Sequence, residues 1–597
     1  MRKLIILLFV FIMATGVMPV CAGYIIPDEE LVVYNRIKDN AEVKEGSGSR
    51  SYVYSALCKL YSGRDVKKAN LLLSDEKIVS VSSKEEFEQS PFQLYWSMPA
   101  YIKIYSLFNS QNGKRTPGLI EADTEKQMEN VMWSFVQSYY DNLFTDDPCR
   151  IADSENHDIL KKTSVYLAVQ CLKNKDDYTI LPDGKTIDEF LKFAEEYFDK
   201  WLTERAKIGL LVEGSENYRT ITLEGIYNLM DLSENHIVRN KAKMFADVLW
   251  IEYATESLNG IRGGGKTRVY NRAGEADNGF LWFAMLGSIY FGLNKEYNPS
   301  PIVSVLASDY RPPEIAEQII NGRTESFEFI KTIPGCGKTE NVEGNPVYIL
   351  DTEKKVMSYQ YITPDYIAGT LFEENEKELI LLSSQNRWQG VIFADGFNNR
   401  LYPYTDTSAS THNNFFSVQN GPLMMFRKNS DIGVESGIYI SGFGGVFAED
   451  DFENGWFFGK FENAYYGIKP LNGSLYSKNG KLLLTESNSP FVIHIGCEME
   501  DGSFVTFKNR VKNNSFFAGG NNAYYHDVKW GEISLGENTR LINGKALDYN
   551  PPFVMDSPYM KSEKGSGIYD VTFDGKRIIY DFNSGKIYHL PYIAERK

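Results

Sequence analysis

The sequence predicts a two-domain protein that is helical in its N-terminal half and built from antiparallel strands in its C-terminal half. Three observations lead to this fold class. The chain has 597 residues, which is too many for one hydrophobic core. Apolar residues recur with helical spacing from about Glu29 to Gly292. From about Val347 onward, aromatic and β-branched residues alternate with hairpin signals.

The first 22 residues have the pattern of an export signal. Arg2 and Lys3 precede an apolar run from Leu4 to Val17, and small side chains flank the expected cleavage after Ala22. We therefore expect a signal peptide at 1–22 and export to the periplasm or the medium. Cys21 leaves open the alternative of a lipid-anchored protein. No later stretch has the about 18 uncharged apolar residues that a membrane span requires.

A helical domain is expected at 23–325. One apolar stripe runs from Met128 to Phe144. Four further helices are predicted at 155–172, 187–206, 216–231 and 236–257. Short turns such as Pro182-Asp183-Gly184 separate them, so neighbouring helices should pack antiparallel. Several helical hairpins in succession favour an (α/α) toroid or solenoid.

A domain of antiparallel strands is expected at 326–597, most simply as a β-sandwich. Its clearest predicted strands are Val356–Ile362, Leu379–Ser383, Trp388–Phe393, Gly437–Ile440 and Trp456–Ile468. Three dipeptides between such runs predict hairpin turns: Asn479-Gly480, Asp501-Gly502 and Asp574-Gly575.

Composition argues against several classes of partner. The formal net charge is −16, and loss of the signal with its two basic residues makes it more negative. This sign disfavours nucleic acid, and an acidic polysaccharide would need a local basic patch. Five cysteines follow the signal: Cys58, Cys149, Cys171, Cys336 and Cys497. They fit neither a disulfide scaffold nor a zinc site, although a single pair stays open. No metal or cofactor is expected.

A repeated tetrapeptide opens three of the predicted helices. The copies are Ser154-Glu155-Asn156-His157, Ser215-Glu216-Asn217-Tyr218 and Ser233-Glu234-Asn235-His236. The first two helices have the same parity in the antiparallel series, so Asn156, His157 and Tyr218 should meet at one end of the domain. The third copy should lie at the opposite end as a helix cap. Ser-Glu-Asn is also an ordinary helix start, so a purely structural role stays open for all three copies.

A glycine-rich segment, Gly260–Thr267, matches the letters of a nucleotide-binding P-loop. It follows a predicted helix rather than a strand, so nucleotide binding is not expected. Its cations Arg262 and Lys266 are followed by Arg268 and Arg272. Two interpretations stay open, a mobile solvated loop or a binding surface for anionic groups of a substrate.

Other ionisable residues also belong to the candidate set. His412 lies in a small polar loop before a strand, a typical place for a site residue. His494 alternates with apolar neighbours and is expected to be a strand residue with a satisfied side chain. Glycoside hydrolysis would need a carboxylate pair. The carboxylates near the expected site are Glu213, Glu216, Glu275 and Asp277.

Together these residues resemble the polysaccharide lyases of the heparinase II/III and alginate lyase type. In that group an Asn-His pair opens one inner helix, as Asn156-His157 does here, and a catalytic Tyr follows, matched by Tyr218. A His-containing loop before a strand that ends in Gly is matched by His412–Gly421, with Asn413 where the family has Asp. The resemblance implies an incomplete (α/α) toroid followed by an antiparallel β-sandwich.

The resemblance also implies a function. We expect an exported lyase that cleaves a uronic-acid-containing polysaccharide or oligosaccharide by β-elimination, without a metal. The implied catalytic residues are Tyr218, His157 and His412, and the implied substrate-binding residues are Asn156, Arg219 and Arg268. Two alternatives stay open: a glycoside hydrolase on a toroid scaffold, and a glycan-binding protein without activity.

Overall fold

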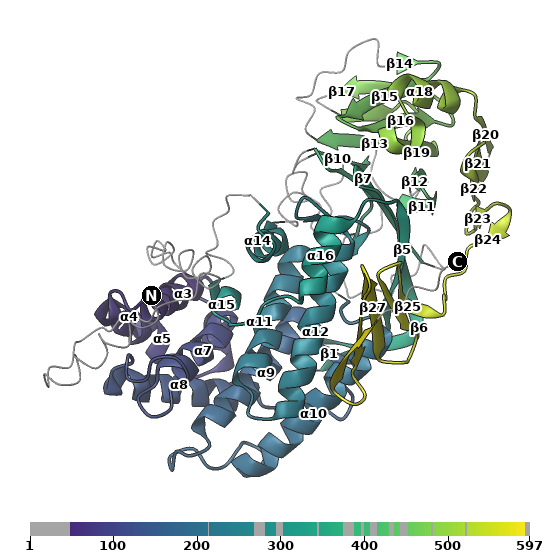
Figure 1. The fold of residues 1–597 in the computed structure, drawn as a ribbon. Helices are drawn as coiled ribbons and strands as arrows, with labels where there is room; N and C mark the ends of the chain where they lie inside the picture. Colours follow the sequence, from purple (N-terminus) through teal and green to yellow (C-terminus); the bar gives the residue numbers. More distant parts are fainter. Residues whose placement is uncertain are drawn as a thin grey trace, which may run out of the picture.

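The computed structural model describes residues 48–141, 143–212, 214–267, 281–293, 303–342, 345–373, 387–395, 399–405, 415–428, 435–441, 452–478, 481–519 and 522–591. The signal segment, the strand predicted at Leu379–Ser383 and the turn predicted at Asn479-Gly480 lie outside these ranges. Within them, helices come first and antiparallel sheets follow (Figure 1). No described helix is both long and apolar enough to cross a membrane.

The helices that precede the sheets include the four whose residue ranges were predicted from the sequence. In chain order they are α3 (Ser49–Ser62), α4 (Val66–Leu73), α5 (Glu76–Val79), α6 (Lys84–Glu88), η2 (Leu94–Ser97), α7 (Met98–Phe108), α8 (Ala122–Tyr139), α9 (Glu155–Leu172), α10 (Ile187–Ile208), α11 (Glu216–Leu232), α12 (His236–Thr255), α14 (Leu281–Tyr290), α15 (Val303–Leu306) and α16 (Glu314–Gly322). The bounds of α9 to α12 agree with prediction to within two residues. A capping box at Thr186 starts α10, and Gly209, with φ 110°, ends it.

Helices α9 and α11 run in the same direction, as the parity of the series predicts. The carboxylate of Glu155, at the start of α9, accepts hydrogen bonds from the backbone N–H of Val212, just before α11. At the far ends, Gln170 donates to the carbonyl of Leu232 and accepts from the N–H of Glu234. The first two tetrapeptides therefore share one end of the helical region, and the third lies at the opposite end.

Helices α3 and α7 begin at this end as well. Trp96, just before α7, packs against His157 in the first turn of α9, while Ser106 and Cys171 meet near the ends of the same two helices. Ser49 binds the start of α3 to the segment that enters η2. We call this end, where α3, α7, α9 and α11 begin, the rim.

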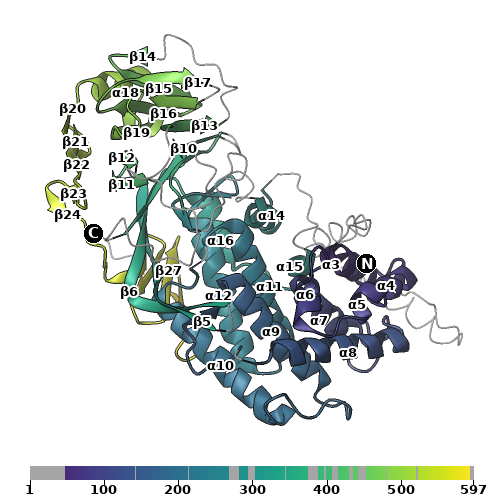
Figure 2. The ribbon, with the colours of Figure 1, turned by 180° about the vertical axis from the view of Figure 1, so that it is seen from behind.

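The largest sheet has 14 strands among the described residues. In pairing order it contains β17 (Leu475–Lys478), β18 (Lys481–Leu484), β13 (Ser436–Ser441), β10 (Arg400–Thr405), β9 (Gly390–Phe393), β7 (Tyr366–Phe372), β6 (Asn345–Ile362), β5 (Phe327–Val342), β25 (Phe553–Asp556), β26 (Met560–Glu563), β27 (Ile568–Phe573), β28 (Lys576–Asp581) and β29 (Lys586–Pro591), with β1 (Arg150–Ala152) beside β6. The long strands β5 and β6 extend from the helices to the distal sheets (Figure 2). The C-terminal strands return to the helices, where Tyr569 donates to the carbonyl of Ala206.

Two smaller sheets are stacked on the distal half of the first. The second sheet contains β11 (Phe415–Asn420), β12 (Leu423–Lys428), β19 (Phe491–Cys497), β16 (Ala464–Pro470), β15 (Trp456–Phe461) and β14 (Phe452–Glu453), and the third contains β20 (Ser515–Gly519), β21 (Asn522–Asp527), β22 (Gly531–Leu535), β23 (Arg540–Ile542) and β24 (Lys545–Ala546). One buried cluster, with Phe393, Phe426 and Phe491, lies between the first and second sheets. Another, with Met425 and Tyr525, lies between the second and third. The distal region is therefore a stack of antiparallel sheets.

Two turn predictions had different outcomes. Asp574-Gly575 is a hairpin turn between β27 and β28, with φ 43° and 76°. The prediction at Asp501-Gly502 was wrong, because this dipeptide joins two helices, α17 (Glu498–Asp501) and α18 (Phe504–Lys512). Ser503 explains the difference, since its hydroxyl accepts from the N–H of Thr506 at 3.1 Å and caps the second helix. The cysteines whose side chains are described, Cys58, Cys149, Cys171 and Cys497, are free thiols.

Candidate functional site

Asn156 and Tyr218 lie in the first turns of α9 and α11, at the rim. The two helices approach closely at Gly225, where a Cβ would lie 3.0 Å from Thr163 Oγ1. Two helical turns are about seven residues, so the same two stripes reach the rim at Tyr218 and Asn156. Asn156 is fully buried, and its Oδ1 accepts a 2.9 Å hydrogen bond from Ser154 Oγ. Tyr218 is partly buried.

His157 is oriented by an acidic residue and an indole. Its Nδ1 lies 2.6 Å from Asp153 Oδ2, and its ring meets Trp96 edge-on at 4.4 Å between centroids. Asp153 has φ 70°, a left-handed conformation that costs a non-glycine residue energy and is enriched at functional sites. Because Asp153 engages Nδ1, Nε2 is the ring nitrogen left for a ligand, as an acceptor when the ring is neutral and as a donor when it is protonated. The Asp153–His157 pair therefore presents one ring nitrogen to a ligand.

A cavity of about 320 Å³ lies beside this pair, within the range of small-molecule sites. Lys161 lines it and stands over the rings of Tyr95 and Tyr139, at 5.3 and 5.2 Å. Its Nζ also lies 3.3 Å from a carboxylate oxygen of Glu88. The lining thus combines phenol rings, a paired cation and His157, which are the kinds of group that bind a sugar.

Arg219 is held by another residue rather than facing the rim. Its guanidinium donates two hydrogen bonds to Glu252, at 3.0 and 2.9 Å, and its side chain is 5% exposed. Although burial alone would raise it, Arg219 and Lys331 hold the pKa of Glu252 well below its usual range. The expected role of Arg219 as a clamp for a substrate carboxylate is not supported, because the guanidinium is already occupied.

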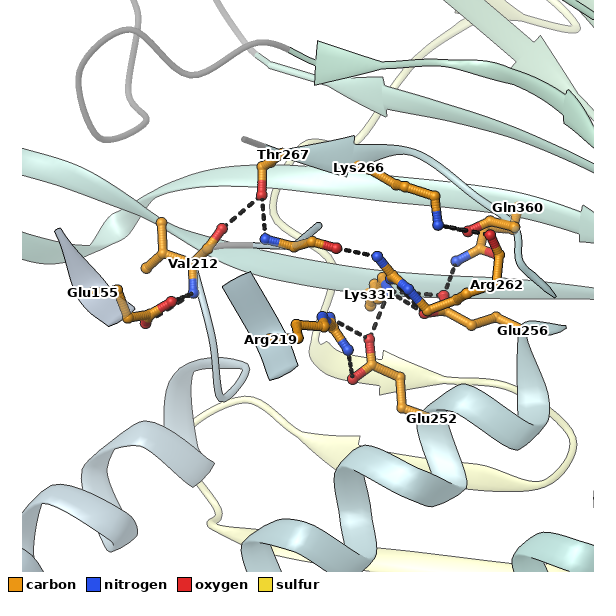
Figure 3. A network of polar contacts seen from close by, with 12 residues as sticks. Glu155, Val212, Arg219, Glu252, Glu256, Arg262, Lys266, Thr267, Lys331 and Gln360 are labelled. Carbon is orange, nitrogen blue, oxygen red and sulfur yellow. Dashed lines mark hydrogen bonds and ion pairs between the residues drawn. The ribbon is translucent and has the colours of Figure 1, made fainter. Parts of the chain in front are cut away.

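A buried polar network continues from this ion pair and joins the helical region to the sheets (Figure 3). Lys331, on β5, donates to Glu252 and to both carboxylate oxygens of Glu256, at 2.6 to 2.9 Å. Glu256 also binds Arg262 and Gln360. All of these side chains are at most 3% exposed. The network fixes the end of α12 against β5 and β6.

The glycine-rich segment belongs to this network, and neither of its two predicted interpretations was right. Arg262 and Lys266 are fully buried, so the described part is neither a solvated loop nor a surface for anions. Lys266 donates to the carbonyl of Arg262 at 2.6 Å. Gly264, with φ 76°, lies so close to Gly369 on β7 that a Cβ on the latter would overlap its Cα. Glycines are needed here for close backbone approach, not for phosphate binding.

Thr267 completes the connection to α11. Its hydroxyl donates to the carbonyl of Val212 and accepts from the N–H of Gly214, both at 2.7 Å. Val212 is also bound by Glu155, which pairs with Arg205 at 2.9 Å. The segment that leads into Tyr218 is therefore fixed from the sheet side and from the α9 side.

The remaining candidates divide into structural residues and residues outside the described ranges. The third tetrapeptide is a cap as predicted, because Asn235 Oδ1 accepts from the N–H groups of Ile237 and Val238. His494 is a satisfied strand residue as predicted, with Nδ1 2.9 Å from Tyr525 Oη, and burial lowers its pKa to about 3. Outside the described residues lie His412, Arg268, Arg272, Glu213, Glu275, Asp277 and the side chain of Glu216.

Sequence reasoning missed Asp153 and Trp96. An Asp four residues before a His at a helix start was the available signal for Asp153, since that spacing brings two side chains together. Nothing local pointed to Trp96, which reaches His157 only through the packing of η2 against α9.

In the described part of the chain, no three His, Cys, Asp or Glu side chains are grouped so as to hold a metal ion. No model of a known protein family matches the chain, and no curated protein is recognisably similar to it.

Proposed function

We propose that the protein is an exported polysaccharide lyase that cleaves a uronic-acid-containing polymer by β-elimination. The observation that supports the proposal is that α9 and α11 begin at the same end, so that Asn156 and Tyr218 lie two turns before the Thr163–Gly225 contact, with His157 following Asn156 in the first turn of α9. This arrangement is similar to the Asn-His pair and Tyr of heparinase II/III and alginate lyase type enzymes. Helices that begin together at the rim fit the inner ring of an incomplete (α/α) toroid, and the stacked sheets fit a β-sandwich.

The proposed reaction removes the C5 proton of a uronate and breaks the C4–O bond to the next sugar. The electron pair of the C5–H bond forms the C4–C5 double bond, and the leaving oxygen takes up a proton. Asn156, through its amide N–H groups, and His157, through Nε2–H of its protonated ring, bind the uronate carboxylate and stabilise the charge that builds up on it. Tyr218 is the base and then the acid. Its ordinary pKa is about 10, so base catalysis requires a surrounding that favours the phenolate.

The test uses purified protein with alginate, heparan sulfate, chondroitin, hyaluronan and glucuronan, followed by ultraviolet absorbance of the unsaturated uronate. We expect absorbance to rise with at least one substrate and Tyr218→Phe to lower the rate by about 100-fold or more. Tyr476→Phe, an exposed tyrosine on β17, is the control and should be unchanged. Undiminished elimination by Tyr218→Phe would refute its role.

One observation favours a second candidate, a glycoside hydrolase. Glu224 on α11 is 2% exposed, and burial raises the pKa of its carboxyl. A raised carboxyl pKa is what the general acid of such enzymes needs. Release of reducing sugar without absorbance, lost in Glu224→Gln, would establish this alternative. Glycan affinity without reducing sugar or absorbance would indicate a binding protein.

A further inference from the structure

We propose that Arg50, with Trp96 and Trp282, forms a site at the rim for an anionic group of the ligand, and that this group is a sugar carboxylate. The identification as a uronate rests on the proposed function, whereas the anion site itself does not. Sequence reasoning did not single out any of these three residues.

The guanidinium of Arg50 is only partly used by the protein. Its Nε and Nη2 are buried and have no hydrogen-bond partner among the described residues. Buried donors without an acceptor are rare, because each one loses its bonds to water without replacement. The residue as a whole is only partly buried, so Arg50 lies at the edge of the packed interior.

Two indoles hold this cation in place. The guanidinium carbon lies 5.0 Å from the ring centroid of Trp96 and 5.9 Å from that of Trp282. Cation–π contacts fix the position of the group and leave its N–H edge unused. A planar fork of donors between aromatic rings is suited to a carboxylate attached to a sugar ring.

The buried carboxyl of Glu224 interacts with Arg50 but does not satisfy its hydrogen-bond donors. Glu224 is close enough to interact with it electrostatically, but burial outweighs this attraction and raises the pKa of Glu224. Its Oε1 instead accepts a 2.9 Å hydrogen bond from Tyr54, and its Oε2 has no partner among the described residues. Because no hydrogen bond joins Glu224 to Nε or Nη2 of Arg50, these two donors remain for another anion.

The position of Arg50 connects it with the candidate site. It is the second residue of α3, which begins at the rim. Trp96, against which it packs, is the indole that contacts His157 at 4.4 Å. A ligand held by Arg50 therefore lies one aromatic ring away from the Asp153–His157 pair.

The experiment measures binding by the full-length mature protein through quenching of tryptophan fluorescence. The first probe is a mannuronate tetrasaccharide from alginate, and the second is its neutral form with the carboxyls reduced to alcohols. The third is a tetrasaccharide with reduced carboxyls that carries sulfate groups as its only anions. Arg50→Met keeps the length of the side chain and removes the charge, Arg50→Lys keeps the charge and removes the fork, and Arg64→Met, on the exposed turn after α3, is the control.

We expect the uronate to bind the wild type and the Arg64→Met variant equally, and Arg50→Met to bind it about 10- to 100-fold more weakly. Arg50→Lys should lie between them. The carboxyl-reduced probe should bind weakly and equally to all four proteins. Tighter binding of the sulfated probe than of the uronate would contradict the carboxylate assignment.

Equal uronate affinity of Arg50→Met and wild type would overturn the proposal, as would equal affinity of the wild type for the uronate and its reduced form. The second comparison needs no variant, so it holds even if Arg50→Met fails to fold. Uronate binding that depends on Arg50, without any unsaturated product, would overturn the lyase and leave the anion site. Elimination by Arg50→Met at unchanged kcat/KM would overturn the anion site and leave the lyase.

Discussion

Replacement of Lys331 by Met should destabilise the junction between the helical region and the sheets. Lys331 Nζ donates to Glu252 at 2.6 Å and to the two oxygens of Glu256 at 2.9 and 2.7 Å. Both carboxylates are in the last turn of α12 or directly after it, where the helix dipole disfavours negative charge. The lysine is therefore the cation that β5 supplies to two buried anions.

The size of the destabilisation follows from the partners that Glu252 and Glu256 retain without Lys331. Removing one partner from a buried ion pair costs about 3–5 kcal/mol when the other charge is left uncompensated. Here Glu252 retains two hydrogen bonds from Arg219, and Glu256 retains Arg262. The loss should therefore lie near the lower limit, at about 3 kcal/mol in the free energy of unfolding.

Urea unfolding followed by tryptophan fluorescence measures this loss for the cooperative unit that contains α12 and β5. Lys561→Met is the control, since Lys561 is 58% exposed on β26 of the same sheet and pairs with Asp556 at 3.0 Å. Such an exposed pair should contribute less than about 1 kcal/mol. The double variant Lys331→Met, Glu256→Gln should lose at least about 1 kcal/mol less free energy of unfolding than the two single variants lose together. A loss no larger than that of the control would refute the reasoning.

Three further predictions concern stability. Gly369→Ala should lose about 1–3 kcal/mol in urea unfolding, because the new Cβ overlaps the backbone of Gly264, and an unchanged midpoint would contradict this. Asn235→Ala should lose about 1 kcal/mol of cap energy without changing glycan affinity or activity, and a changed affinity would mean that the third tetrapeptide is not only a cap. His494 has a folded-state pKa of about 3 against about 6.5 when unfolded, so the unfolded chain takes up its proton first as the pH falls. Stability should therefore drop by about 2 kcal/mol more between pH 7 and 5 in wild type than in His494→Gln, and equal slopes would contradict the assignment.

The sequence predicted local elements best where one physical signal was continuous. The apolar stripes of α9 to α12 have the 3.6-residue period over several turns, and their observed bounds lie within two residues of prediction. Helix parity then placed the first two tetrapeptides together and the third at the far end, because short connections leave few other packings. The hairpin signal failed at Asp501-Gly502, where Ser503 adds a competing helix-start signal that the dipeptide rule ignores.

Long-range pairing could not be predicted. Arg262, Lys266 and Arg219 are charged residues near glycines or a presumed site, and in sequence they are indistinguishable from cations that face solvent. The burial of Arg219 and Arg262 depends on Glu252 and Glu256 at the end of a helix, which also bind Lys331 on a strand beyond the predicted domain boundary. Lys266 instead donates to the carbonyls of Arg262 and Gly263. A charge pattern becomes an ion network only when the fold supplies the partner, and no local signal encodes that.

The first and third copies of the tetrapeptide have the same four residues but different roles, because the helix begins at a different residue in each. In the third copy α12 begins after Asn235, whose side chain caps it. In the first copy α9 begins after Ser154, which places Asn156 inside the first turn. Ser154 does not cap the backbone there, and its hydroxyl donates instead to Asn156 Oδ1. Since that bond holds the amide oxygen, the amide nitrogen points the other way, and it is the donor that the proposed lyase mechanism assigns to the uronate carboxylate. A shift of two residues in where the helix starts thus separates a cap from a candidate substrate-binding residue.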